Sequence, residues 1–132
     1  MPADFFDTNV ILYLLDEGSK ADRAAATLAD GGWISVQVLN ESLANCIRKA
    51  GMSWQEAAEF LSGVRELCQV VDLTLEIHRV GLALGERYGF SVYDGMIVAA
   101  ALTSGCERLL SEDMQHGMVV EDRLRIVDPF RL

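Results

Sequence analysis

The sequence has few of the residues that staple a small fold or bind zinc. Its three cysteines, Cys46, Cys68 and Cys106, are odd in number, lie far apart and form no Cys-x-x-Cys pair. Reduced, buried thiols are therefore expected. The only two histidines, His78 and His116, show no spacing typical of a zinc site, and we expect neither to be a metal ligand.

Long apolar runs are also missing. The longest strictly apolar runs, such as 96–102, are far shorter than the roughly 20 residues needed to cross a bilayer, so no membrane contact is expected. The start, MPADFFDT, has no basic segment of the kind found in secretory signals. With 132 residues, 51% hydrophobic residues and only 2 prolines, the sequence predicts one globular, cytoplasmic domain spanning residues 1–132.

Basic residues are scarce. The chain has 11 basic and 20 acidic residues, a net charge of −9, which argues against broad, sequence-blind binding to nucleic acid. A nucleic-acid substrate is still compatible with this charge, because metal ions held by an acidic site can lie between the carboxylates and a phosphodiester.

Short apolar runs predict strands, and capping residues followed by helical periodicity predict the helices between them. The expected strands span 3–6, 33–34, 69–73, 108–110 and 124–128. The expected helices span 9–15, 19–29, 36–50, 54–67, 75–88 and 92–103, with N-caps at Ser35, Ser53, Thr74 and Ser91. Such alternation predicts a three-layer α/β domain with a mostly parallel central sheet flanked by helices.

Four acidic residues fall where such a sheet collects its ligands, beyond the carboxyl ends of the strands. Asp7 and Asp113 each follow an expected strand, Asp94 lies in the first turn of its helix, and Glu41 lies in the second turn of another. Each has an alternative explanation when taken alone. Asp7 and Asp94 suit helix capping, Asp113 suits a turn, and Glu41 suits a solvated helix surface.

Helical phase distinguishes two of these acids. Asp94 shares a stripe with the apolar residues 97, 98 and 101, so its carboxylate is expected to point inward. Glu41 lies off the apolar stripe of Val36, Leu39, Leu43 and Ile47, on a polar edge that also holds residues 37, 45 and 48. Four carboxylates converging on one rim would repel one another, and a hard divalent cation such as Mg²⁺ or Mn²⁺ relieves that repulsion.

The residues around these acids resemble those of the PIN-domain ribonucleases, and most closely the VapC-type toxins of toxin–antitoxin systems. The resemblance is carried, in order and over nearly the whole chain, by FFDTNVILYLL, SVQVLNE, FSVYDGMIVAAAL and LLSEDMQHG. It implies a three-layer PIN-like fold. It also implies a metal-dependent endoribonuclease that hydrolyses RNA phosphodiester bonds.

The resemblance further implies roles for particular residues. Asp7, Glu41, Asp94 and Asp113 would bind Mg²⁺ or Mn²⁺ and form the catalytic pocket, which Thr8, Asn9 and Ser111 would shape. Glu112 sits one place off the pattern and is expected to be solvated. Gly95 stands where the family commonly has alanine, and we expect it only to weaken its helical turn. The expected partners are a VapB-type antitoxin, an RNA substrate and a second copy of the chain, in a homodimer and a hetero-oligomer.

RNA contacts are a separate expectation. Arg48 and Lys49 follow the polar edge of Glu41 and are candidates, although a basic pair at a helix end also suits the helix dipole.

Other functions were weighed against this one. A haloacid-dehalogenase-type phosphatase needs a second acid two residues after the first, where this chain has Asn9. A receiver-like module needs a lysine near its last strands, yet Lys20 and Lys49 are the only lysines. A non-catalytic module that binds a structural cation through the same acids stays open.

Overall fold

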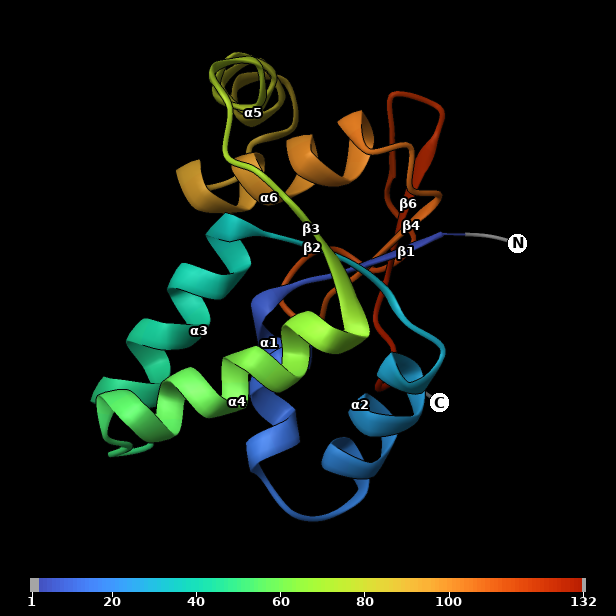
Figure 1. The fold of residues 1–132 in the computed structure, drawn as a ribbon. Coiled ribbons are helices and arrows are strands. Elements are labelled where there is room, and N and C mark those ends of the chain that lie inside the picture. Colours follow the sequence, from blue (N-terminus) through green and yellow to red (C-terminus); the bar gives the residue numbers. More distant parts are fainter. Residues whose placement is uncertain (1–2, 132) are drawn as a thin grey trace.

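The computed structural model describes residues 3–131, which form a six-stranded sheet between layers of helices (Figure 1). The strands are β1 (Asp4–Phe6), β2 (Gly32–Ser35), β3 (Cys68–Val71), β4 (Arg108–Leu110), β5 (Val119–Val120) and β6 (Leu124–Val127). Their order is β3-β2-β1-β4-β6-β5, and every pairing is parallel except that of β5 with β6. This is the predicted three-layer α/β architecture with a mostly parallel sheet.

The helices are α1 (Thr8–Leu12), α2 (Ser19–Ala29), α3 (Val36–Arg48), α4 (Trp54–Leu67), α5 (Leu75–Tyr88) and α6 (Val92–Thr103), and η1 (Tyr13–Leu15) is a 3-10 turn. In Figure 1, α5 and α6 lie above the sheet, whereas α1, α2 and α4 lie below it. No helix within residues 3–131 is long and apolar enough to cross a membrane.

Local capping chemistry defines most of these helices. Ser35, Ser53, Thr74 and Ser91 each accept a hydrogen bond from a backbone N–H in the first turn of α3, α4, α5 and α6, as predicted. The predicted helices 19–29, 54–67, 75–88 and 92–103 are confirmed at these bounds.

Six predicted elements need correction. The strands expected over 3–6, 33–34 and 124–128 span Asp4–Phe6, Gly32–Ser35 and Leu124–Val127. The helix expected over 9–15 is a single α-helical turn followed by η1, and the helix expected to reach Ala50 ends at Arg48. The strand expected at 69–73 spans Cys68–Val71, and β5 was not predicted at all. The two residues of β5 become a strand only by pairing with β6, which local sequence does not reveal.

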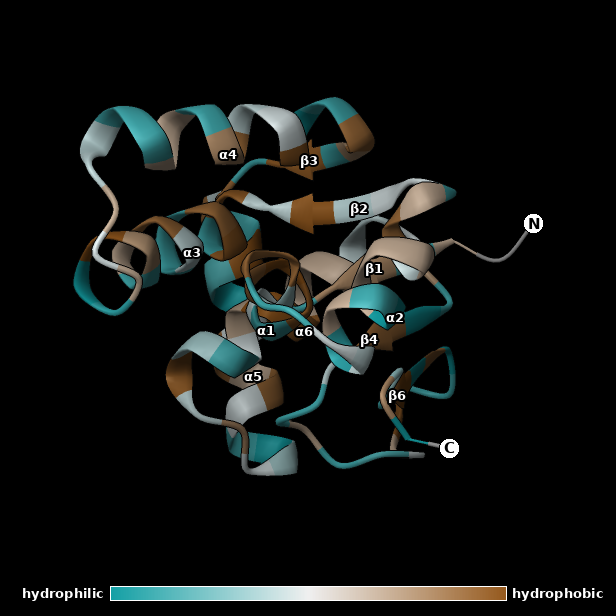
Figure 2. Cartoon of the chain, turned by 90° about the horizontal axis from the view of Figure 1, so that it is seen from below, coloured by the Kyte–Doolittle hydropathy of each residue, from teal (hydrophilic) through white to brown (hydrophobic). Residues whose placement is uncertain are grey.

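The apolar core lies between the sheet and its covering helices. Figure 2 shows the hydrophobic colour on α6 near the centre and hydrophilic turns on the outer parts of α2 and α4. Phe5 and Phe6 of β1 have no exposed surface, and α6 is buried from Ile97 to Leu102. A helix that is apolar on all sides is buried inside a domain. The burial of α6 therefore also fixes the position of its first turn, which contains Asp94.

The packing of α6 on α5 corrects the expectation for Gly95. A Cβ atom at Gly95 would lie 2.9 Å from the backbone oxygen of Gly81, and one at Gly81 would lie 2.6 Å from the sulfur of Met96. The Met96 side chain can shift, but the backbone of Gly81 cannot do so easily, so the close approach of the two helices favours glycine most strongly at position 95. The helical turn of Asp94 is thereby held directly against α5.

The face of α3 was also predicted incorrectly. The buried residues are Val38, Ser42 and Cys46, whereas Leu39 and Leu43 are only partly buried. The inward stripe is thus rotated by about one residue, because small polar Ser42 takes a core position. Glu41 nevertheless lies on the polar edge where it was expected.

Candidate active site

The rim between β1 and β4 is the point at which the order of the strands reverses. From β1 the chain builds outward to β2 and β3 on one side, while β4 and β6 lie on the other. Phe6 pairs with Leu110 at the carboxyl ends of β1 and β4, and the Asp7 amide donates to the Leu110 carbonyl at 3.0 Å. Open α/β sheets bind their ligands beyond the strand ends at such a point, and Asp7 and Ser111, both buried, follow these two strands directly.

Asp7 is the most buried acid of the rim, with only 4% of its surface exposed. Its Oδ1 accepts from the Thr8 amide at 2.7 Å, and its Oδ2 accepts from the Ser111 hydroxyl at 2.6 Å. Within residues 3–131 it has no ion pair with a cationic side chain. Burial raises its pKa to about 6, against the opposing hydrogen bonds, and the charges of Asp94 and Asp113 add to the increase.

Asp94 and Glu41 reach the same region from two different helices. Burial raises the pKa of Asp94, and the charges of Glu41 and Asp113 raise it further. The Glu41 carboxylate accepts from the Thr8 hydroxyl at 3.1 Å and from the Gln37 amide at 2.7 Å. Asp94 thus interacts electrostatically with each of the other three predicted acids, Asp7, Glu41 and Asp113.

Asp113 differs from the others because its side chain is exposed. Its Oδ2 accepts from the Asn9 amide at 2.9 Å, and its backbone N–H donates to the Ser111 hydroxyl at 3.2 Å. Asn9 also accepts from the Glu112 amide at 3.3 Å. Thr8, Asn9 and Ser111 thus each contact an acid of the rim. Their role in shaping a pocket stays a prediction, for which these contacts are suitable.

Asp7 caps a helix as well as lying at the rim, whereas Asp94 takes part in the cap of its helix through its backbone N–H. Asp7 is the N-cap of α1, and the Asp94 amide donates to Ser91 at 3.3 Å in the cap of α6. Capping and a ligand role were alternatives in the sequence, but they are compatible here. Each carboxylate oxygen has two lone pairs, so an oxygen that accepts one hydrogen bond keeps a second position for a cation.

Two expectations about neighbouring residues turn out differently. Glu112 was expected to be solvated, but it forms a salt bridge with Lys20 and accepts from the Tyr13 hydroxyl at 2.5 Å. The Lys20 ammonium lowers the pKa of Glu112. Gln37 was not predicted as a site residue, although its spacing of four from Glu41 on one helix placed the two side by side.

The basic pair lies apart from these contacts. Arg48 ends α3 and Lys49 follows it, both exposed. Arg48 borders a hollow of about 340 Å³ together with Trp54, whose side chain is 70% exposed. A contact of Arg48 or Lys49 with RNA stays a prediction.

The donor chemistry of the rim fits a hard divalent cation. Its acids supply carboxylate oxygens, the ligands that Mg²⁺ and Mn²⁺ prefer, and buried Asp7 lacks a compensating positive charge. Within residues 3–131 no three acidic, histidine or cysteine side chains converge closely enough to hold a metal alone. Mg²⁺ usually takes one or two carboxylates and completes its shell with water and substrate oxygens.

The chain is an α/β protein with an open, mostly parallel sheet, and acidic residues follow the strands at the point where the strand order reverses. Comparison with family models identifies the family. Residues 5–117 match the PIN domain family, so the chain belongs to that family. Among proteins with curated descriptions, none matches the chain significantly.

Solved structures share the fold at low sequence identity. A toxin–antitoxin complex from Klebsiella pneumoniae contains a chain with a TM-score of 0.75 and 19% identity, covering 98% of this chain and 100% of that one. A chain of DNA-bound VapBC from Salmonella typhimurium has a TM-score of 0.71 and 18% sequence identity, and the match covers 98% of this chain and 99% of that one. VapC20 of Mycobacterium tuberculosis is described as a sarcin–ricin loop cleaving toxin. It has a TM-score of 0.69 and 18% sequence identity, and the match covers 84% of this chain and 90% of that one.

Proposed function

We propose that this protein is a Mg²⁺- or Mn²⁺-dependent endoribonuclease and the toxin of a VapBC-type toxin–antitoxin pair. The observation that carries the proposal is Asp7, a buried carboxylate with a pKa raised to about 6 and no cationic partner within residues 3–131. It lies at the switch point of a PIN domain together with Glu41, Asp94 and Asp113. A nucleic-acid phosphodiester is a suitable substrate because its anionic oxygens complete the shell of a shared cation.

The side chains of the rim have distinguishable tasks. Buried Asp7 and half-buried Asp94 would hold the cation, and Ser111 would fix the rotamer of Asp7 through its hydroxyl. A bound divalent ion would lower the pKa of an attacking water and neutralise charge on the leaving oxygen. Asp113, which is exposed and accepts from Asn9, and Glu41, which is half-buried and accepts from Thr8, would accept a proton from water or ligate an ion.

The proposed partners rest on the neighbours and on charge. Several structural neighbours are described as toxin–antitoxin complexes, and two of these are bound to DNA. An acidic rim on a chain of net charge −9 suits a basic segment of an antitoxin. We propose an antitoxin that covers the rim, and a homodimer of this chain within the complex.

A cleavage assay with matched variants tests the function. Purified protein is incubated with total RNA in Mg²⁺, in Mn²⁺ and in EDTA, alongside Asp7→Asn and Asp4→Asn. Asp4 lies on the same strand but pairs with Arg108, so its replacement removes an acid without touching the rim. We expect cleavage that requires a divalent ion, is lost in Asp7→Asn and persists in Asp4→Asn.

Two results would contradict the proposal. Cleavage by a folded Asp7→Asn protein at the wild-type rate would remove the rim from the chemistry. Metal binding without cleavage of any RNA in a broad panel would instead favour a non-catalytic metal-binding module. Sequencing of RNA ends after controlled expression, with Asp7→Asn as the control, would then identify the RNA and its cleavage site.

A further inference from the structure

Two adjacent acids, Glu112 and Asp113, follow Ser111 in the loop after β4, yet they face different neighbours. Asp113 is tied to the acidic rim by two contacts: its Oδ2 accepts from Asn9 at 2.9 Å, and its backbone N–H donates at 3.2 Å to Ser111, whose hydroxyl donates to Asp7. Glu112 instead contacts side chains of η1 and α2. The loop thus presents one carboxylate to the rim and directs the next one elsewhere.

Glu112 is held by a group of residues that we call the clasp, formed by Tyr13, Lys20 and Phe130. The Tyr13 hydroxyl donates to Glu112 Oε1 at 2.5 Å, and the Lys20 ammonium donates to Oε2. Lys20 Nζ also donates to the Tyr13 hydroxyl at 3.1 Å and lies 5.0 Å from the centre of its ring. Phe130 packs edge-on against Tyr13 with ring centres 4.7 Å apart.

The clasp has a clear physical consequence for its neighbour. Asp113 is exposed, so burial does not fix its side chain, and its direct side-chain contact is the bond from Asn9. The backbone of the loop is held by Ser111 and Asn9, and the direction of its adjacent acids depends in addition on how the Glu112 side chain is held. Without the clasp, Glu112 would carry a free negative charge one residue from the rim and would be free to compete with Asp113 for a cation.

We propose that Lys20 and Tyr13 are positioning residues that select Asp113, rather than Glu112, as the fourth carboxylate of the acidic rim. The inference rests on the proposed function in that a divalent cation binds the rim. It assigns no catalytic step to Lys20 or Tyr13, since both act through Glu112.

The affinity for Mn²⁺, measured by calorimetry in the absence of RNA, tests the proposal. Partners bonded directly to a metal ligand typically change affinity by about tenfold or more; Lys20 acts one residue away, through Glu112, so we expect Lys20→Met to weaken Mn²⁺ binding by less than that. Lys20→Arg keeps the charge and the donors and should restore it. Arg23→Met is the matched control, because it removes a cation of α2 that forms no ion pair within the described part of the chain.

A second comparison separates selection from simple support of the fold. In the wild type, Asp113→Asn should weaken Mn²⁺ binding. In the Lys20→Met background the same substitution should weaken it less, because the released Glu112 can take the place of Asp113. The double variant Lys20→Met with Glu112→Gln should remove this compensation and restore the full effect of Asp113→Asn.

The outcomes are distinguishable from failure of the proposed function. If Lys20→Met lowers only the melting temperature, while Mn²⁺ affinity and the effect of Asp113→Asn stay unchanged, the clasp is structural and the proposal is wrong. If the wild type binds no Mn²⁺, both proposals are overturned. If it binds Mn²⁺ with the expected pattern but cleaves no RNA, the selection of Asp113 stands and the ribonuclease assignment fails.

Discussion

The two ends of β1 carry the same functional group in opposite circumstances. At the amino end, the Asp4 carboxylate accepts from Arg108 Nε at 2.8 Å and from Arg108 Nη2 at 2.7 Å across the β1–β4 pair. At the carboxyl end, three residues later, Asp7 is buried and has no cationic partner within residues 3–131. The first carboxylate is compensated within the fold, whereas the second is left for something outside it.

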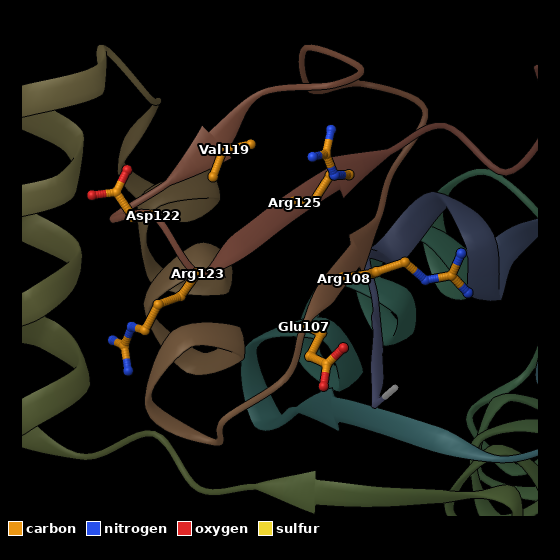
Figure 3. Close-up of a pocket in the computed structure, with 6 residues that line it drawn as sticks. All are labelled: Glu107, Arg108, Val119, Asp122, Arg123 and Arg125. Atoms are coloured by element: carbon orange, nitrogen blue, oxygen red, sulfur yellow. The ribbon is translucent and has the colours of Figure 1, made fainter. Parts of the chain in front are cut away.

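The amino end nevertheless has a substantial hollow, of about 580 Å³, shown in Figure 3. Its lining alternates in charge, and the side chains of Arg108, Arg123 and Arg125 point away from one another rather than toward a common centre. No ligand site is defined by such divergent groups. The difference between the two ends lies in charge compensation: the carboxyl end keeps a buried acid without a cationic partner among residues 3–131, whereas the amino end has the larger hollow but pairs its acid with Arg108.

The pH dependence of stability should show the largest difference between the two ends. Raising the pKa of Asp7 from 3.8 to about 6 on folding corresponds to about 3 kcal/mol. Between these values the folded state binds more protons than the unfolded state, so this contribution makes the metal-free protein less stable as pH rises from about 4 to 6. Urea unfolding of wild type and Asp7→Asn across this range measures it as their difference.

The matched variant at the amino end supplies the control for that measurement. Asp4→Asn should keep the Asp7 contribution, because Asp4 lies at the other end of the strand. Asp7→Asn should be more stable than the wild type above pH 6, where the wild type must bury a charge. Equal profiles for wild type and Asp7→Asn would show that Asp7 is not desolvated on folding.

Addition of a divalent ion should offset the loss of stability caused by burying the charged Asp7 at the carboxyl end. At a free Mn²⁺ concentration 100 times the dissociation constant, the wild type should gain about 2.7 kcal/mol in the free energy of unfolding. Asp4→Asn should gain the same amount, and Asp7→Asn should gain far less. Thermal unfolding with and without Mn²⁺ measures this gain, and an equal gain in all three proteins would place the ion elsewhere.

Those features of the carboxyl end that follow from local chemistry could be predicted from the sequence. Ser35 and Ser91 are N-caps that predict the helices containing Glu41 and Asp94. The carboxyl ends of parallel strands lie at one edge of the sheet. The pairing of Glu112 with Lys20 could not be predicted, because the two residues are 92 positions apart. They come together only because α2 packs near the loop after β4. It depends on tertiary structure alone.

The core-facing side of α3 shows a different reason for failure. Periodicity assigns apolar residues inward, but Ser42 is fully buried on this helix, and its hydroxyl has no hydrogen-bond partner within the described residues. The space available in the core, rather than the polarity of the side chain, therefore explains the residue at position 42. A pattern of hydrophobicity cannot report a small side chain that is selected for its volume.

Substitution of Gly95 should affect the carboxyl end by an intermediate amount. In Gly95→Ala the added methyl group would meet the backbone of Gly81, and overpacking of this kind costs about 1–3 kcal/mol. The first turn of α6 would move, so Mn²⁺ binding by Asp94 should weaken as well. Chemical denaturation and Mn²⁺ calorimetry measure both effects.

Gly85→Ala is the matched control for this substitution. A Cβ at Gly85 would make an ordinary contact at 3.6 Å with the Phe90 oxygen, and the gain in helix propensity is up to about 1 kcal/mol. We therefore expect it to be neutral or stabilising with unchanged Mn²⁺ affinity. Gly95→Ala as stable as Gly85→Ala would show that α5 and α6 do not require glycine at their contact.

The smallest effect is expected for the ion pair at the amino end. Asp4 and Arg108 have side chains that are 20% and 44% exposed, so water and salt screen their attraction. Asp4→Asn should cost only about 0.2–1 kcal/mol in the free energy of unfolding, and the loss should shrink at high salt. Urea unfolding at two ionic strengths measures it. Because the pair neutralises itself, its removal should leave Mn²⁺ affinity unchanged; a loss as large as that of Asp7→Asn would mean that the two ends of β1 are not functionally distinct.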